Sequence, residues 1–297
     1  MAPRLESNVF KTALFFEGGS MRACYSSAVA VHLLEQGIYF DNVYGISAGS
    51  SNTVNYLSRD IERTRASFTS FIGDPHVGSM KTFLQGRGAF NAEYIYQKAG
   101  LPGAALPFDW ETFQSNPANC CVISFDRDTG EDLYFTRETM RTLDDLMMQV
   151  RASSTLPVIM PMPTVESRPC YDGGFARGGG IPLQKIEEDG FEKVVVIRTQ
   201  RRGYRKKKYL GWANAWFWHR PVIREAMTSR WIRYNESCDL LDQWEREGRA
   251  YVFYCDDLTV AGQERDVELL QANYDAGYAQ IQRDFPALMR FIEDAER

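Results

Sequence analysis

The sequence has few of the residues from which disulfide frameworks and metal sites are built. Its 297 residues include six cysteines and three histidines. No two cysteines form a CxxC pair, which is the spacing typical of zinc and redox sites. We therefore expect reduced, buried thiols. The adjacent Cys120 and Cys121 are expected to point to opposite faces of one strand.

Long hydrophobic runs and an excess of positive charge are also lacking. The first apolar run, Ala13–Phe16, is far too short for a signal-peptide core or a membrane span, and no later run reaches about 18 residues. A net charge of −5 argues against a general nucleic-acid binder. Hydrophobic residues at 44% exclude wholesale disorder. We expect a cytoplasmic enzyme.

The sequence does contain a repeated pattern of strand, glycine turn and helix. Thr12–Phe16 is a short apolar run that ends near a glycine pair, and a helical pattern follows from Ser20 to Gln36. Asn42–Tyr44 and Ala48–Leu57 repeat this order around Gly45. Such a repeat is typical of a parallel sheet with crossover helices.

The remaining pattern predicts one three-layer α/β/α sandwich with a mainly parallel sheet. Later strands are predicted at Cys120–Phe125, Asp132–Phe135, Val165–Tyr171, Val194–Thr199 and Tyr251–Cys255, and helices at Glu138–Ala152, Pro221–Glu247 and Glu264–Asp294. The stretch from Gly73 to Pro107 is long for an inert connection, so we expect a lid or pocket lining there. We expect a catalytic domain at 12–200 and a helical C-terminal extension at 201–297, packed on the same domain.

The strongest local signal is Gly45-Ile46-Ser47-Ala48-Gly49, between a predicted strand and a predicted helix. A serine at this place sits on a sharp turn that projects its hydroxyl from the sheet edge. The flanking Gly45 and Gly49 avoid collisions across that turn. The following helix directs its N-terminal amides to the same spot. This pattern predicts a nucleophilic Ser47.

A second signal, Glu17-Gly18-Gly19-Ser20-Met21-Arg22, directly follows the first strand. Small residues at a helix start leave amides that can bind an anion, either an oxyanion or a dinucleotide pyrophosphate. The dinucleotide fingerprint needs G-x-G-x-x-G, but Ser20 and Ala23 occupy its second and third glycine positions. An oxyanion loop is therefore favoured.

A third signal, Asp172-Gly173-Gly174, ends a predicted strand, and its glycines leave the carboxylate accessible. In this order, the three motifs resemble those of the patatin-like acyl hydrolases, in particular the bacterial branch. The segment Arg151-Ala152-Ser153-Ser154-Thr155-Leu156-Pro157 resembles the alanine-serine-serine-x-x-proline block of that family. The resemblance runs from about Ala13 to Arg198.

The resemblance implies a Ser–Asp dyad that hydrolyses fatty acyl esters of phospholipids or lysophospholipids. Ser47 would be the nucleophile and Asp172 its base, with an acyl-enzyme intermediate. The loop Gly18, Gly19, Ser20, Met21 and Arg22 would form the oxyanion hole, while Gly45, Gly49, Gly173 and Gly174 would support the elbow and the aspartate. No metal and no other cofactor is implied. The alternatives are a carboxylesterase for small esters and a catalytically weak acyl-lipid-binding regulatory protein.

A histidine triad is a further alternative, because Ser47, Asp172 and His219 follow the chain order of α/β-hydrolases. The early position of the serine elbow and the preceding glycine loop favour the dyad. His32 on the first predicted helix is interpreted as structural, and His76 as a loop residue.

The run from Arg201 to Lys208 is strongly basic and precedes Trp212, Trp216 and Trp218. Such a segment suits anionic lipid headgroups. The competing interpretation is a solvated loop whose following aromatics pack on the core. The expected partners are thus a lipid or acyl-ester substrate and peripheral contact with an anionic membrane, without nucleic acid. The sequence leaves the oligomeric state open.

Overall fold

The computed structural model describes residues 5–78, 90–208 and 211–297. Among these residues, eight strands form one mixed sheet in the order β5-β6-β3-β2-β1-β7-β8, with β4 paired to β3. The strands are β1 Thr12–Phe16, β2 Asn42–Ile46, β3 Asn119–Asp126, β4 Asp132–Thr136, β5 Thr164–Val165, β6 Arg168–Asp172, β7 Lys193–Ile197 and β8 Ala250–Phe253.

Five of these strands form the parallel centre of the sheet. β3, β2, β1, β7 and β8 pair in parallel, while β4 and β6 run antiparallel to β3. The carboxyl ends of β1 and β2 therefore meet at one edge, as they do in parallel sheets joined by crossover helices. The antiparallel β6 pairs Asp172 with Ser124 of β3.

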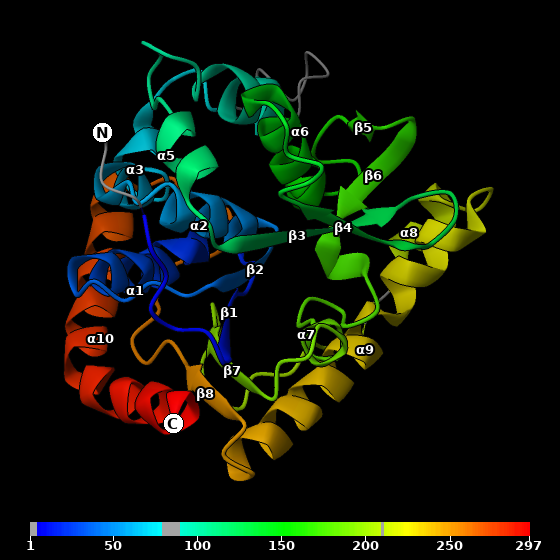
Figure 1. The fold of residues 1–297 in the computed structure, drawn as a ribbon. Coiled ribbons are helices and arrows are strands. Elements are labelled where there is room, and N and C mark those ends of the chain that lie inside the picture. The colour runs from blue at the N-terminus through cyan, green and yellow to red at the C-terminus, as the bar shows by residue number, and fades with distance from the viewer. Residues whose placement is uncertain (1–4, 79–89, 209–210) are drawn as a thin grey trace.

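Helices cover both faces of the sheet, as expected for an α/β/α sandwich. Figure 1 shows α1 and α10 on one side of the sheet and α9 on the other. The helices are α1 Ala23–Glu35, α2 Ala48–Leu57, α3 Ile61–Ala66, α5 Trp110–Ser115, α6 Leu143–Ser154, α7 Leu183–Glu188, α8 Trp212–Trp216, α9 Pro221–Arg246 and α10 Val267–Glu296. Shorter turns are η1 Ser20–Arg22, η2 Ser70–Gly73, η3 Tyr94–Lys98 and η4 Gly173–Phe175.

Alternate residues of the central strands enter two separate cores. Leu14 and Phe16 of β1 pack on the side of α1, α2 and α10, whereas Ala13 and Phe15 pack on the side of α7 and α9. Such strands are buried on both faces, which explains their continuous apolar sequence. The six cysteines are free and buried. Cys120 and Cys121 enter opposite cores, as predicted.

Two predicted elements differ clearly from those in the structure. Val165–Tyr171 is two strands, because Glu166 and Ser167 adopt positive φ angles of 48° and 67° and turn the chain. The helix predicted from Glu138 begins at Leu143, after a capping box. In that box the Thr142 hydroxyl accepts a hydrogen bond from the amide of Asp145 at 3.1 Å.

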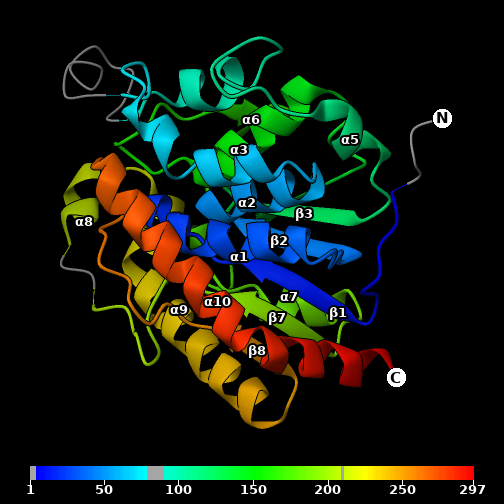
Figure 2. The ribbon, with the colours of Figure 1, turned by 90° about the vertical axis from the view of Figure 1, so that its left-hand side faces the viewer.

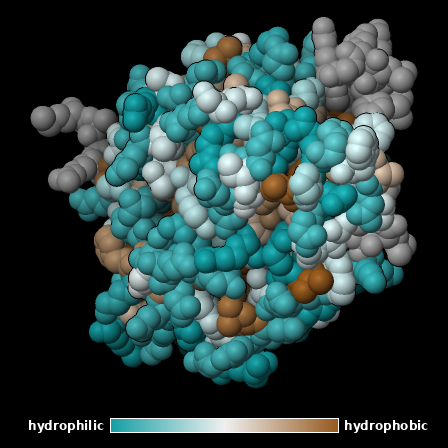
Figure 3. Space-filling view, turned by 90° about the vertical axis from the view of Figure 1, so that its right-hand side faces the viewer, coloured by the Kyte–Doolittle hydropathy of each residue, from teal (hydrophilic) through white to brown (hydrophobic). Residues whose placement is uncertain are grey.

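The C-terminal region is built into the same layers as the rest of the chain. β8 pairs in parallel with β7, and Figure 2 shows α10 lying across α1. Buried Tyr25 of α1 donates a hydrogen bond to Gln280 of α10. Because α1 lies between the sheet and α10, nearly all its residues are buried, from Ala23 to Leu34. The face that carries α8 and α9 is mostly hydrophilic, with small separate apolar patches (Figure 3). No helix among the described residues is long and apolar enough to cross a membrane.

Docking of α10 should contribute strongly to stability. Leu288 of α10 is fully buried, so Leu288→Ala should lower the free energy of unfolding by about 2–5 kcal/mol through lost packing and a cavity. Leu269→Ala on the exposed side of the same helix is the matched control and should have little effect. Urea unfolding measures both, and equal losses would contradict the docked position of α10.

Candidate active site

Ser47 occupies a strained turn between β2 and α2. Its φ of 57° and ψ of −129° lie in a region that favours glycine, at a cost of about 1–3 kcal/mol. The surrounding structure holds this conformation. The Ser47 amide donates to Ser153 Oγ at 2.9 Å, and Ser153 Oγ donates to the carbonyl of Ile123 at 2.6 Å. The serine of the alanine-serine-serine block therefore anchors the elbow to β3.

The glycine loop after β1 lies against the end of β7. Thr199 Oγ1 donates to the carbonyl of Gly18 at 2.6 Å. A Cβ atom on Gly19 would lie 2.4 Å from the same hydroxyl, so only glycine fits there. Ser20 has a positive φ of 52°, a backbone conformation that favours glycine. The loop therefore keeps a tight turn at a residue that is not glycine.

The loop offers fewer free amides than the five residues predicted for it. The amide of Met21 donates to the carbonyl of Gly262 at 3.1 Å, and that of Arg22 to the carbonyl of Gly19 at 3.3 Å. For Gly18, Gly19 and Ser20, the described part of the chain supplies no hydrogen-bond acceptor. These three amides can therefore receive an anion in the cavity.

A buried ion pair fixes this loop to β7 and α9. Glu17 Oε2 accepts hydrogen bonds from Arg198 Nε at 2.8 Å and from the Thr199 amide at 2.9 Å. Its Oε1 accepts from the Tyr234 hydroxyl of α9 at 2.6 Å. Burial raises the pKa of Glu17, but the Arg198 charge and these hydrogen bonds more than offset it, so the pKa lies below its ordinary value.

Asp172 ends β6 and is buried, with 2% of its surface exposed. Its amide donates to the carbonyl of Thr155 at 2.9 Å, again within the alanine-serine-serine segment. Its Oδ1 accepts from the amide of Gly174 at 2.7 Å, which orients the carboxylate. Both Ser47 and Asp172 thus depend on contacts with residues 153–155.

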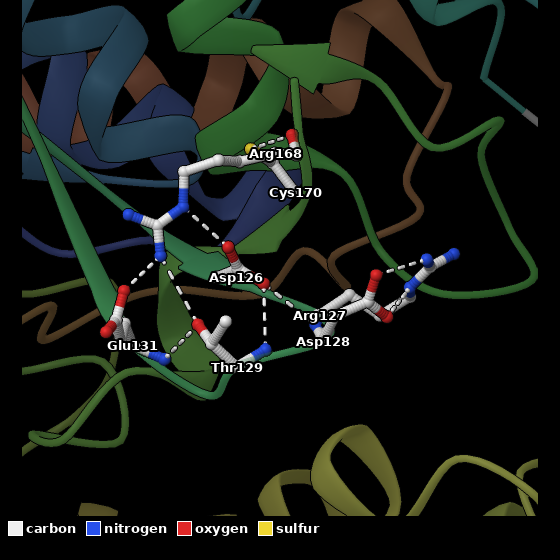
Figure 4. Close-up of polar contacts among 7 residues, drawn as sticks. All are labelled: Asp126, Arg127, Asp128, Thr129, Glu131, Arg168 and Cys170. Atoms are coloured by element: carbon white, nitrogen blue, oxygen red, sulfur yellow. Dashed lines mark hydrogen bonds and ion pairs between the residues drawn. The ribbon is translucent and has the colours of Figure 1, made fainter. Parts of the chain in front are cut away.

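A charged network fixes β6 to the β3–β4 hairpin (Figure 4). Arg168 Nε donates to Asp126 Oδ2 at 2.6 Å, and Asp126 Oδ1 accepts the amides of Asp128 and Thr129 at 2.8 and 3.0 Å. Arg168 also contacts Glu131. Burial raises the pKa of Asp126, but the amides and Arg168 hold it below its ordinary value. The network fixes the strand that ends at Asp172.

Ser47 and Asp172 line the same cavity, which has a volume of about 320 Å³. Within the described chain no hydrogen bond joins their side chains directly. The glycine loop lines the cavity as well. Most of its other lining is apolar and comes from residues 54–108 and 146–160, including Val54, Phe68, Phe71, Ile72, Phe108, Leu146, Met147 and Ile159. Binding sites for small molecules have this mixture of apolar walls and few polar groups.

The predicted pocket-lining role of the stretch from Gly73 to Pro107 is confirmed in part. Val77, Phe90, Ile95 and Leu106 line the cavity, while residues 79–89 lie outside the described chain.

A model of the patatin-like phospholipase family matches residues 14–183, more than half of the chain. The chain belongs to the patatin-like phospholipase family. A second model, of a domain of unknown function (DUF6363), matches residues 220–293. The fold is similar to that of VipD from Legionella pneumophila, with a TM-score of 0.52 and 12% sequence identity over 96% of this chain and 67% of that one. None of the curated proteins matches this chain.

The supporting glycines of this patatin-like chain lie where backbones meet closely. A Cβ atom on Gly49 would lie 2.0 Å from the carbonyl oxygen of Phe16, and one on Gly173 would lie 2.1 Å from that of Ile123. At Gly45 it would lie 2.4 Å from Thr53 Oγ1. Each glycine therefore lets a helix or turn pack directly on the strand beside it.

None of the three histidines is among the residues that line the Ser47 cavity of the patatin-like domain. His219 is exposed, contacts Trp218 and does not line the cavity. His76 is exposed in a loop beside Asp74. His32 is buried between the rings of Tyr278 and Phe285, in agreement with its structural interpretation.

The sequence prediction missed the buried residues that fix the glycine loop of the patatin-like site to β7 and α9. Glu17, Arg198 and Tyr234 come from three separate parts of the chain, and no local motif joins them. The one available signal was an acidic residue at the end of an apolar strand, where burial requires a charged partner.

Replacing Glu17 should destabilise the protein. Glu17→Gln leaves buried Arg198 without its counter-charge, so the free energy of unfolding should fall by about 3–5 kcal/mol. Glu192→Gln, at an exposed carboxylate, is the control and should change little. Urea unfolding at neutral pH compares the two variants. If Glu17→Gln loses no more free energy of unfolding than Glu192→Gln, the stabilising role of the ion pair is contradicted.

The same carboxylate should make stability depend on pH. Because the folded-state pKa of Glu17 is lowered, its contribution is complete above the unfolded-state pKa of about 4.3 and is lost as pH falls through the folded-state pKa. Urea unfolding between pH 6 and 3 should therefore show a smaller acid-dependent loss in Glu17→Gln than in the wild type.

Proposed function

We propose that the protein is a serine lipid acyl hydrolase in which Ser47 and Asp172 act as a catalytic dyad. One observation carries the proposal: the strained serine, the buried aspartate and the free amides of the glycine loop all open on one apolar cavity. Membership of the patatin-like phospholipase family supports lipid acyl hydrolysis at the level of the family.

In the proposed reaction, Ser47 Oγ attacks the carbonyl carbon of an acyl ester. The Asp172 carboxylate accepts the hydroxyl proton and then gives it to the leaving alcohol as the ester C–O bond breaks. Asp172 then takes a proton from water, which attacks the carbonyl carbon of the acyl-enzyme. As the bond between that carbon and Ser47 Oγ breaks, Asp172 returns the proton to Ser47 Oγ and the fatty acid leaves. The amides of Gly19 and Ser20 stabilise the tetrahedral oxyanion, and Arg22 adds positive charge nearby.

The cavity favours a long acyl chain over a small ester. Its walls carry Val54 of α2, leucine, methionine and valine side chains of α6, and phenylalanine, isoleucine and leucine side chains from the described residues between 67 and 108. Burying an apolar chain there stabilises the complex by about 25 cal/mol per Å² of surface removed from water. We therefore propose phospholipids or lysophospholipids as substrates. We also propose that residues 12–200 form the catalytic domain and that residues 201–297 pack on it.

The dyad is tested by labelling with a fluorescent fluorophosphonate and by ester hydrolysis. Ser47→Ala should abolish both signals, because the nucleophile is absent. Asp172→Asn keeps the shape of the side chain but removes the base, so turnover should fall by at least about 10²-fold.

The exposed His219 provides the control for this experiment. His219→Ala should label and turn over like the wild type, and a loss equal to that of Asp172→Asn would replace the dyad with a histidine triad. Failure of the folded wild type to label or hydrolyse would favour the acyl-lipid-binding alternative.

We also propose peripheral contact with anionic membranes through part of the Arg201–Lys208 segment. Arg202 pairs with Glu245, and Arg205 pairs with carboxylates of α9. Lys207 and Lys208 remain exposed, and Trp216 and Trp218 are 61% and 72% exposed. Exposed cations near tryptophans suit an anionic membrane surface.

Neutralising these two lysines should weaken membrane binding. Lys207→Gln with Lys208→Gln should reduce sedimentation with phosphatidylserine vesicles, since each cation contributes about 1 kcal/mol near an anionic surface. Binding to neutral phosphatidylcholine vesicles should not change. Undiminished sedimentation with the anionic vesicles would favour the solvated-loop interpretation.

A further inference from the structure

Three cations that line the cavity lie close enough to act on one another, and we call them the cation cluster. They are Arg22 of η1, Lys206 of the segment after β7, and Arg230 of α9. Arg22 belongs to the predicted oxyanion loop. Lys206 and Arg230 lie outside the matched patatin-like region, and the acyl transfer proposed above assigns them no role.

No member of the cluster forms an ion pair with a carboxylate of the described residues, which are 5–78, 90–208 and 211–297. Neighbouring arginines differ, because Arg198 pairs with Glu17 and Arg202 with Glu245. The Nε of Arg22 is buried and has no hydrogen-bond partner. The positive charge of the three cations is thus only partly compensated, by the Asp172 carboxylate that lies beside Arg230 without forming an ion pair with it.

Lys206 is held in place by α9. Its amide donates to Asn235 Oδ1 at 2.8 Å, and its carbonyl accepts from Asn235 Nδ2 at 3.0 Å. Its Nζ lies 4.1 Å from the centre of the Tyr234 ring. Burial and the charge of Arg230 lower the pKa of Lys206 to about 7. A neighbouring anion would raise the pKa of Lys206 again, because it favours the charged form of the lysine.

Arg230 reaches the active site through a gap that glycine leaves. Its Nε donates to the carbonyl of Gly179 at 3.2 Å, and its guanidinium lies 5.1 Å from the centre of the Phe175 ring. A Cβ atom on Gly174 would lie 2.0 Å from Arg230 Nη2 and 2.8 Å from Asp172 Oδ1. The guanidinium is therefore fixed beside the proposed catalytic base.

Three gathered cations favour an anion in the space between them. Like charges repel most in a partly buried site of low dielectric, and a bound anion relieves that repulsion. Guanidinium and ammonium groups form charge-assisted hydrogen bonds with phosphate oxygens. The apolar walls come from α2, α6 and the segment 67–108, and α2 and α6 lie on the face of the sheet opposite α9. One cavity thus combines an anion site with a chain site.

We infer that Lys206 and Arg230, with Arg22, bind the phosphate of an acyl lipid and give the enzyme a preference for net-anionic phospholipids over neutral acylglycerols. This inference rests on the proposed acyl hydrolase function and names its substrate class. Glu17 is committed to Arg198, and Asp172 is the proposed catalytic base beside Arg230, so neither carboxylate is assigned to a cationic headgroup such as choline. The C-terminal region thereby determines specificity at a site whose proposed chemistry lies in the patatin-like region.

The test compares lysophosphatidylglycerol with a monoacylglycerol of the same acyl chain. The measured quantity is the ratio of kcat/KM for the two substrates. Lys206→Met and Arg230→Met should each lower this ratio about tenfold or more, because each removes a charge-assisted hydrogen bond to phosphate. Arg246→Met, at an exposed position at the far end of the same helix α9, is the matched control and should keep the wild-type ratio.

Two outcomes would overturn the inference. If the ratio is unchanged in both variants, the cluster has no role in headgroup binding. If kcat/KM falls equally for both substrates, the cluster supports the fold or the reaction and not the choice of substrate. If the wild type hydrolyses neither lipid, the proposed function fails, and the subsite is tested by binding of the two lipids to Ser47→Ala. Inorganic phosphate is tested as a competitor of lysophosphatidylglycerol. If phosphate binds as tightly as the lysolipid, the site is assigned to free phosphate and the lipid role is overturned.

The pH dependence gives a second readout that a purely structural role would not move. The phosphodiester of lysophosphatidylglycerol keeps its charge between pH 6 and 9, whereas Lys206 loses its proton as pH rises through about 7. The ratio should therefore fall with rising pH in the wild type and stay flat in Lys206→Met. The groups that act on Lys206 are Arg230, Arg22, Arg198, Glu17, Tyr204 and Tyr234. A flat wild-type profile would contradict the role of Lys206.

Discussion

The buried pair of Glu17 and Arg198 is the interaction on which the rest of the site depends. Glu17 directly follows β1 and precedes the glycine loop, and Arg198 directly follows β7. Tyr234 extends the contact to α9. A buried charge is tolerated only when it is paired and hydrogen-bonded, so these three elements must assemble together. The shape of the glycine loop is therefore a tertiary property of the sheet and α9.

The elbow and the aspartate are held by a different part of the chain. Ser153 binds the amide of Ser47, and the carbonyl of Thr155 accepts the amide of Asp172. Two groups that are 125 residues apart in sequence thus depend on one short segment at the end of α6. This segment supplies a physical reason for the alanine-serine-serine block, which holds the strained φ of Ser47 and the end of β6.

The local sequence predicted the parts of the fold that local rules control. The bounds of Thr12–Phe16 and Ala48–Leu57 agree with β1 and α2, because glycines and apolar runs mark their ends. The prediction failed at Val165–Tyr171, where Glu166 and Ser167 turn at positive φ without a glycine to signal it. It also missed Lys206 as a cavity residue, since a lysine within a basic run is ordinarily solvated, and only its contacts with α9 turn it inward.

The sequence by itself determined the α/β class, the order of the three motifs and the serine elbow, because strand, turn and helix patterns are set by neighbouring residues. Only the tertiary structure decided which amides of the glycine loop stay free, which carboxylate neutralises Arg198, and which cations meet around the cavity. These properties depend on contacts between residues far apart in the chain. Burial and distance, rather than residue type, determine whether such a charge is paired, solvated or left to bind a ligand.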